Sequence, residues 1–171
     1  MEMRKTLTTL LCATALVATA ADRRAPGFSL VDSKGIEHDL ADYRGKPVLL
    51  ALIQTTCPHC AAFAENLQQA QEKFGDKVTI LAVVTPPDTP AKVTDFIVGH
   101  KIAYPILFDS GQMSYSYILS QTLNFPQLFM IDAGGTIRAE HVYSPLTREI
   151  FEGNELGPAI SRMLSGSAPK K

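Results

Sequence analysis

The stretch Thr-Thr-Cys-Pro-His-Cys at residues 55–60 decides the fold, because it joins two segments with different hydrophobic patterns. Residues 48–53 before it are all apolar, which predicts a buried parallel strand that is covered on both faces. After it, apolar residues recur at spacings of three and four and predict one buried stripe on a helix. They are Phe63, Leu67, Ala70 and Phe74. The stretch therefore lies at a strand-to-helix junction.

The two cysteines of this stretch, Cys57 and Cys60, form a C-x-x-C pair at the predicted start of the helix. Unpaired N–H groups and the helix dipole at that end favour the thiolate of Cys57, the reactive form of a cysteine. The three-residue separation brings both sulfurs to one side of the first turn. We therefore expect Cys57 to attack and the more buried Cys60 to resolve a mixed disulfide. Such a pair is typical of thiol–disulfide exchange.

His59 lies between the two cysteines. If its imidazole is protonated, it stabilises the Cys57 thiolate further, and a better stabilised dithiol makes the disulfide a stronger oxidant. We therefore predict a catalytic contribution from His59 and a reduction potential above that of thioredoxin, which is about −270 mV. The alternative is an exposed, neutral imidazole without a role. His38, His100 and His141 stand alone in the sequence, and we expect each to be exposed or satisfied by its neighbours.

Length and composition indicate one globular domain. The chain has 171 residues, of which 46% are hydrophobic and 19% charged, and this length allows a single core of common size. The net charge of −1 gives no electrostatic basis for binding nucleic acid or an anionic membrane surface. No internal repeat or long linker divides the chain. We expect one folded domain over residues 21–165 and a disordered tail over residues 166–171.

The first 20 residues have the pattern of an export signal. Arg4 and Lys5 precede an apolar run at residues 7–17, and Ala-Thr-Ala at residues 18–20 fits a small-x-small cleavage site. We therefore predict a signal peptide over residues 1–20 and an exported protein, periplasmic or otherwise extracytoplasmic. The alternative is an uncleaved leader that anchors the protein in the membrane.

Cleavage would also remove Cys12 and leave Cys57 and Cys60 as the only cysteines. Lipid attachment at Cys12 fits less well, because Leu11 precedes it where a small residue is expected. In an oxidising compartment we expect a disulfide between Cys57 and Cys60. It would close a very short loop and stabilise the fold little, so we expect it to be made and broken in function. The cysteine pair is then the redox centre, without a bound cofactor or metal.

The remaining pattern predicts an α/β fold in the order β-α-β-α, followed by a β-hairpin and a last helix. Strands are expected at residues 28–30, 36–38, 48–53, 78–84, 104–108, 128–131 and 136–142, and helices at residues 57–74, 91–99, 113–119 and 155–164. The first half supplies parallel strands through right-handed crossovers. We expect helices on both faces of a central mixed sheet, with the last hairpin as antiparallel edge strands.

Four motifs together resemble a known family. They are Ala-Pro-Gly-Phe-Ser-Leu at residues 25–30, Tyr-Arg-Gly-Lys-Pro-Val at residues 43–48, Cys-Pro-His-Cys at residues 57–60, and Phe-Pro-Gln-Leu-Phe-Met-Ile-Asp at residues 125–132 with two glycines soon after. With this set and spacing the chain resembles the TlpA/ResA-like proteins, which are AhpC/TSA-related, exported bacterial thiol-disulfide oxidoreductases. The resemblance covers residues 25–160. It implies a thioredoxin-like fold with an N-terminal β-hairpin extension.

The resemblance also implies substrates and partners. Such proteins act on protein thiols and disulfides, often serve cytochrome c maturation, and are recycled by a membrane redox protein. We expect this chain to work in the same way, as a monomer. Most of these proteins are reductants, whereas the Pro-His pair inside the motif is also found in oxidising DsbA-type proteins. The direction of electron transfer therefore stays open at this point.

Around the cysteines, the resemblance assigns a substrate groove. Pro126 corresponds to a proline with a cis peptide bond beside the cysteines, a geometry that is too costly for other residues. The alternative is a trans loop proline. Phe125, before it, would offer its backbone to an extended substrate segment. Thr56 stands where the family usually has tryptophan and Phe125 where it commonly has threonine, so with Pro58 they should shape an altered groove.

Asp88 is a candidate for proton transfer. ResA-like proteins carry an acidic residue in the loop after the second core strand, close to the cysteines, and Asp88 lies in the corresponding loop of this chain. As a general base it would assist Cys60 while the mixed disulfide is resolved. The alternative is a solvated acid in a proline-rich loop.

Two other functions occur on the same fold. Sco-like copper-binding proteins use two cysteines and a distant histidine, here His141 or His100, but they space the cysteines as C-x-x-x-C. Two thiolates alone supply half of a tetrahedral zinc site. Peroxiredoxins place Thr or Ser three residues before the peroxidatic cysteine, whereas Gln54 holds that position before Cys57. A metallochaperone-like module and a thiol peroxidase are therefore the rival hypotheses.

Overall fold

A computed structural model describes residues 23–118 and 124–166. The predicted signal peptide with Cys12, residues 167–171 of the predicted tail, and the last residue of the helix expected at 113–119 lie outside the described residues. Within residues 23–118 and 124–166, no helix is long and apolar enough to cross a membrane.

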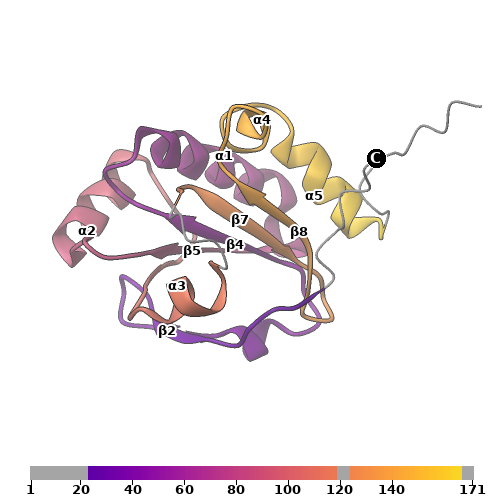
Figure 1. Cartoon of the computed structure of the whole chain (residues 1–171), viewed down its shortest axis with the longest axis horizontal. Coiled ribbons are helices and arrows are strands. Elements are labelled where there is room, and N and C mark those ends of the chain that lie inside the picture. The colour runs from indigo at the N-terminus through magenta and orange to yellow at the C-terminus, as the bar shows by residue number, and fades with distance from the viewer. Residues whose placement is uncertain (1–22, 119–123, 167–171) are drawn as a thin grey trace, which may run out of the picture.

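A six-stranded mixed sheet forms the centre of the molecule (Figure 1). Its strands, in spatial order, are β1 (Arg23–Arg24), β8 (Thr136–Val142), β7 (Gln127–Ile131), β4 (Val48–Ile53), β5 (Thr79–Val84) and β6 (Ile106–Phe108). β4, β5 and β6 are parallel, whereas β7 runs antiparallel to both β4 and β8. The predicted mixed α/β sheet is thus present, with β4 at the residues that its apolar run predicts.

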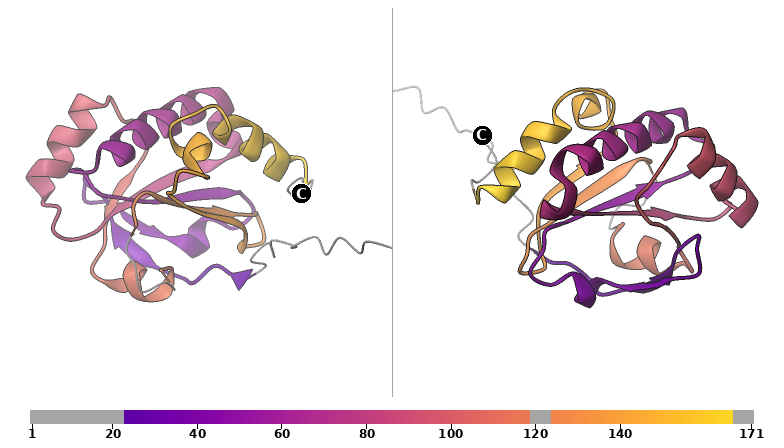
Figure 2. Two further views of the ribbon diagram at one scale, coloured as in Figure 1. Left: turned by 45° about the horizontal axis from the view of Figure 1, so that its top comes forward. Right: turned by 180° about the vertical axis from the view of Figure 1, so that it is seen from behind.

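The two faces of the sheet are covered by different layers (Figures 1 and 2). One face carries α1 (Pro58–Phe74), α2 (Pro90–Gly99), α4 (Arg148–Phe151) and α5 (Leu156–Leu164). The other carries the separate antiparallel hairpin of β2 (Ser29–Val31) and β3 (Glu37–Asp39), the 3-10 turn η1 (Leu40–Tyr43) and α3 (Gln112–Ser116). A further 3-10 turn, η2 (Gly75–Lys77), follows α1. The N-terminal hairpin extension is therefore confirmed.

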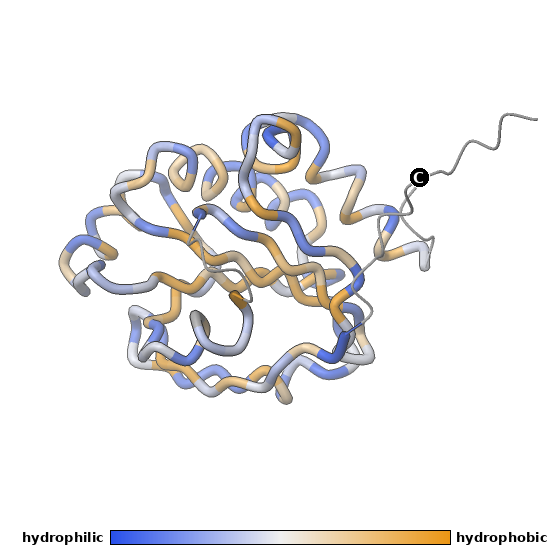
Figure 3. Tube along the Cα trace, viewed as in Figure 1, coloured by the Kyte–Doolittle hydropathy of each residue, from blue (hydrophilic) through white to orange (hydrophobic). Residues whose placement is uncertain are grey.

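β4 shows why its sequence has no polar alternation. Leu49, Ala51 and Ile53 pack into the cluster below the α1 layer, and Leu50 and Leu52 pack into the cluster on the hairpin side. Successive side chains of a strand point to opposite faces, so a strand covered on both faces must be apolar throughout. Figure 3 shows the consequence as a hydrophobic centre with hydrophilic positions on the outer loops and helices.

The predicted place of the last hairpin was wrong. β7 is not at an edge but lies between β4 and β8, and β1 pairs with the outer side of β8. Every residue of β7 is buried, and such a strand needs neighbours on both sides as well as cover on both faces. β1 has only two residues, and its arginines carry no strand signal. Helix α3 is shorter than expected, ending at Ser116.

Candidate active site

The C-x-x-C motif lies where β4 ends and α1 begins. Cys57 is the N-cap residue, with extended φ and ψ of −91° and 118°, and Pro58 is the first residue of the helix. The Cys57 carbonyl accepts hydrogen bonds from the N–H groups of Cys60, at 3.0 Å, and Ala61, at 3.1 Å. Pro58 has no backbone N–H, but at the first helical position an N–H would have no partner within the helix, so the proline costs no hydrogen bond. The Cys57 side chain makes no capping bond, so its thiol is available at the positive end of the helix dipole.

The two thiols differ strongly in access. Both are free, and Cys57 is partly exposed whereas Cys60 is fully buried. The N–H of Gln54 donates to the Cys60 sulfur at 3.4 Å. Burial raises the pKa of the Cys60 thiol far above its usual value, the Gln54 N–H opposes this, and the neighbouring Cys57 and Asp88 raise it further. The structure thus places the two thiols in unequal environments, as a division into attacking and resolving cysteine requires.

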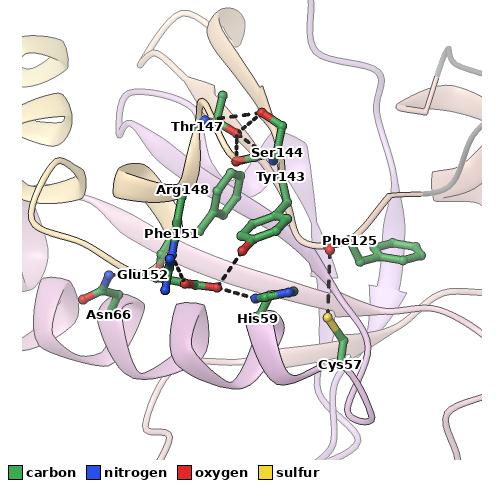
Figure 4. Close-up of polar contacts among 10 residues, drawn as sticks. All are labelled: Cys57, His59, Asn66, Phe125, Tyr143, Ser144, Thr147, Arg148, Phe151 and Glu152. Atoms are coloured by element: carbon green, nitrogen blue, oxygen red, sulfur yellow. Dashed lines mark hydrogen bonds and ion pairs between the residues drawn. The ribbon is translucent and has the colours of Figure 1, made fainter.

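Beside Cys57 lies the loop before β7. The Phe125–Pro126 peptide bond is cis, the geometry that the resemblance predicts. The Phe125 carbonyl faces the Cys57 sulfur at 3.9 Å (Figure 4). The Phe125 ring points away from Cys57 in the same view and packs against both hydrophobic clusters. The backbone of Phe125, rather than its bulky side chain, therefore borders the reactive sulfur. Thr56 and Pro58, the chain neighbours of Cys57, are both exposed.

Asp88 is hydrogen-bonded to Thr55, two residues before Cys57. Its Oδ2 accepts the Thr55 backbone N–H at 2.7 Å, and its Oδ1 accepts the Thr55 hydroxyl at 2.5 Å. The carboxylate is half-buried, and its charge acts on the pKa of Cys60. Asp88 is therefore held close to the buried thiol and is not simply a solvated loop acid.

His59 meets a partner that the sequence pattern does not indicate. Its Nδ1 contacts Oε1 of Glu152, and its ring stacks on the Tyr143 ring with centroids 4.2 Å apart (Figure 4). Half of the His59 side chain is exposed, against 13% of the Glu152 side chain. Tyr143 follows β8 and Glu152 follows α4. Glu152 is 93 positions away from His59 in the sequence. The sequence signal for a short helix here is limited to one oppositely charged pair at i,i+4, Arg148 and Glu152.

The other histidines lie apart from the cysteines. His38 contacts Tyr43 and Asp32 in the hairpin layer, and His100 contacts Glu65 at 2.9 Å. His141 is on β8, where burial, with a smaller effect of Arg162, lowers the pKa of its imidazole. In the described part of the chain, no group of three or more His, Cys, Asp or Glu residues is arranged to hold a metal ion.

Comparison with known proteins identifies the relatives of the chain. The model of the AhpC/TSA family matches residues 21–140. The thiol:disulfide interchange protein DsbE of Vibrio cholerae (strain N16961) is 31% identical over 158 residues, which cover 89% of this chain and 80% of DsbE. The thiol-disulfide oxidoreductase ResA of Geobacillus kaustophilus is 30% identical over 139 residues, covering 79% of this chain and 76% of ResA.

A solved structure supports the same fold. A thiol:disulfide interchange protein of the thioredoxin family from Chlorobium tepidum superposes with a TM-score of 0.72 at 20% identity. The superposition covers 86% of this chain and 99% of that structure. The layered arrangement of sheet and helices is therefore that of a thioredoxin-like domain.

Proposed function

The chain belongs to the AhpC/TSA family and is a thiol-disulfide oxidoreductase of the ResA and DsbE type, and from this premise we propose that it exchanges disulfides with protein substrates outside the cytoplasm through Cys57 and Cys60. One observation carries the proposal. A partly exposed thiol at a helix start lies next to a fully buried thiol. That asymmetry suits an attacking and a resolving sulfur, and the pair itself is the redox centre.

In the reducing direction, the Cys57 thiolate attacks one sulfur of a substrate disulfide. The substrate S–S bond breaks, its other sulfur leaves as a thiolate, and a Cys57–substrate disulfide forms. Cys60 then loses its proton and attacks the Cys57 sulfur, which releases the second substrate thiolate and leaves a Cys57–Cys60 disulfide. Two electrons have passed to the substrate. The same steps in reverse oxidise a substrate dithiol.

The substrate segment is proposed to lie along the Phe125 backbone, because this carbonyl faces the attacking sulfur. An extended peptide binds such an edge through main-chain hydrogen bonds, in the manner of an added strand. The exposed Thr56 and Pro58 would contact the residues around its cysteine. Export through residues 1–20 would place the reaction in the periplasm or another extracytoplasmic compartment, where a membrane redox protein would recycle the pair.

A glutathione redox titration tests the thermodynamic side of this function. We expect the reduction potential of the Cys57–Cys60 pair to lie above that of thioredoxin, about −270 mV, because His59 is adjacent to the thiol that becomes a thiolate. His59→Ala should move the potential toward the thioredoxin value. A wild-type potential at or below about −270 mV would contradict this prediction.

Asp88→Asn tests proton transfer from Cys60. If the Asp88 carboxylate takes this proton, the substitution should slow resolution about a hundredfold, the lower end of what general-base catalysis contributes. The measurement is the rate at which a mixed disulfide of Cys57 with Ellman's reagent releases its aromatic thiolate.

The matched control is Asp95→Asn, which removes the same charge from an exposed position on α2. The opposite outcome is equally informative. The negative charge of Asp88 opposes ionisation of Cys60, so faster release in Asp88→Asn would show that the carboxylate acts only through its charge.

A further inference from the structure

The carboxylate of Glu152 contacts three side chains beside the motif. Oε1 of Glu152 contacts Nδ1 of His59 and accepts the Tyr143 hydroxyl at 2.9 Å, while Oε2 accepts Nε of Arg148 at 2.6 Å (Figure 4). Arg148 is bonded to Oε2 of Glu152, so Oε1 is left for His59 and Tyr143. Both oxygens are therefore engaged, and Glu152 has one well-defined arrangement.

The backbone around Glu152 is held against α1. Nδ2 of Asn66, on α1, donates to the carbonyls of Phe151 at 2.9 Å and Gly153 at 3.0 Å, the two residues that flank Glu152. On the same side, the Thr147 hydroxyl donates to the Val142 carbonyl at 2.7 Å and closes the turn between β8 and α4. The carboxylate is thus positioned by the fold before any substrate binds.

The contact with Glu152 determines which nitrogen of His59 carries a proton. Burial acts to raise the pKa of Glu152, but hydrogen bonds from Arg148, His59 and Tyr143 outweigh it and hold this pKa below its usual value. Glu152 is therefore an anion near neutral pH and can only accept hydrogen bonds. Nδ1 of His59 must then be the donor, and Nε2 of a neutral ring is left with a lone pair.

The free end of the imidazole lies on the side of the reactive sulfur (Figure 4). In Figure 4 the ring end that carries Nε2 points toward the side of Cys57 and the Phe125 carbonyl, away from Glu152. Stacking on Tyr143, with an interplanar angle of 22°, fixes the plane of the ring. The Tyr143 N–H also donates to the Pro126 carbonyl at 3.0 Å. Glu152 is thereby connected to the imidazole directly and to the loop before β7 through Tyr143.

We propose that Glu152 is a positioning residue that holds His59 as the Nδ1–H tautomer, so that Nε2 accepts the proton of the Cys57 thiol. This inference rests on the proposed function, because it describes how that reaction begins. The S–H bond of Cys57 breaks, its electron pair stays on sulfur, and the proton moves to Nε2. The resulting imidazolium lies between the Glu152 carboxylate and the thiolate. In the oxidising direction, where a second substrate thiol displaces Cys57 from the mixed disulfide, the imidazolium returns a proton to the departing Cys57 sulfur.

Charged and titratable groups around His59 agree with this assignment. Glu152 faces it from just after α4, Arg148 lies at the start of α4, Tyr143 is in the segment after β8, and Cys57 is at the start of α1. Arg148 is paired with Glu152 rather than with the ring. The carboxylate is therefore the anionic partner of the imidazole, and its removal should disfavour the imidazolium.

Glu152→Gln tests the inference on the whole chain. A glutamine presents one acceptor and one donor group, so it cannot accept from His59 and Tyr143 on one side and from Arg148 on the other. Alkylation of Cys57 by iodoacetamide should slow about three- to fivefold on the acidic side of its pH profile, as expected for loss of a half-exposed ion pair. The midpoint of the profile should move upward by about half a pH unit.

The matched control is Glu149→Gln, which removes the same charge from the same short helix at an exposed position. Long-range ¹H–¹⁵N spectra of the His59 ring give a second readout that a merely structural role would not move. The wild type and Glu149→Gln should show Nδ1–H, and Glu152→Gln should lose part of this tautomer. Circular dichroism confirms that each variant is folded.

Two results would overturn the inference: an Nε2–H tautomer in the wild type, or the same alkylation profile in Glu152→Gln and Glu149→Gln. Neither readout needs a disulfide substrate. Reduction of a protein disulfide and oxidation of a protein dithiol by the wild type are measured separately. The absence of both would reject the proposed function, while the tautomer and the alkylation profile still decide the role of Glu152.

Discussion

Cys57→Ser should reduce insulin disulfide exchange to the uncatalysed rate, whereas Cys60→Ser should retain the first half of the reaction. This result is expected because the partly exposed Cys57 thiol is the one that a substrate disulfide can reach. A serine hydroxyl does not ionise near neutral pH and cannot replace the thiolate in exchange. In Cys60→Ser the attacking thiol remains, but the buried resolving thiol is missing.

The two variants therefore differ in what they accumulate. Cys60→Ser should form a stable mixed disulfide with its substrates, and Cys57→Ser should form none. Mass spectrometry of non-reduced samples from the compartment to which the protein is exported measures these mixed disulfides directly and identifies the substrates. Equal trapping by both variants would show that either cysteine can attack, and trapping by Cys57→Ser alone would reverse the assigned roles.

Of the substitutions proposed for this protein, Phe63→Ala should lower the free energy of unfolding most. Phe63 is fully buried on α1, and its ring meets the Phe151 ring edge to face at 4.9 Å. Removing a buried aromatic ring leaves a cavity, so the free energy of unfolding should fall by about 3–5 kcal/mol. Urea unfolding of the reduced protein measures this loss, with a slope that stays unchanged if the unfolded state is unaffected.

The control for this prediction is Phe74→Ala, at the last residue of the same helix, where the ring is only partly buried. Its loss should be clearly smaller. A loss below about 1 kcal/mol for Phe63→Ala would mean that the α1–α4 contact is not part of the cooperative core. Since Phe151 precedes Glu152, Phe63→Ala should also loosen the contact between Glu152 and His59.

Local patterns predicted the elements that have one strong signal. The strand at Val48–Ile53 and the helix that follows Cys57 agree with the expected residues, because continuous burial and a 3.6-residue period are visible within a few turns of chain. The two-residue β1 and the four-residue α4 were not predicted. Segments this short have no period to detect, and pairing or packing with distant residues stabilises them.

The same distinction applies to the active site. The spacing of Cys57 and Cys60, with Pro58 between them at a strand-to-helix junction, was readable from the sequence because all of it depends on neighbouring residues. The place of β7 inside the sheet was not, since strand order depends on pairings across the whole chain. Nor was the contact of His59 with Glu152, 93 positions away.

By itself, then, the sequence determined the reactive motif and the helix start that surrounds it, since helix capping and strand burial are short-range properties. The resemblance to a family already predicted that Phe125 and Asp88 lie near that motif. Only the tertiary structure showed which atoms face it and added Glu152, because these residues come from loops that the assembled sheet brings together. No local pattern records such a meeting, because its stabilising free energy comes from packing between segments that are distant in the chain.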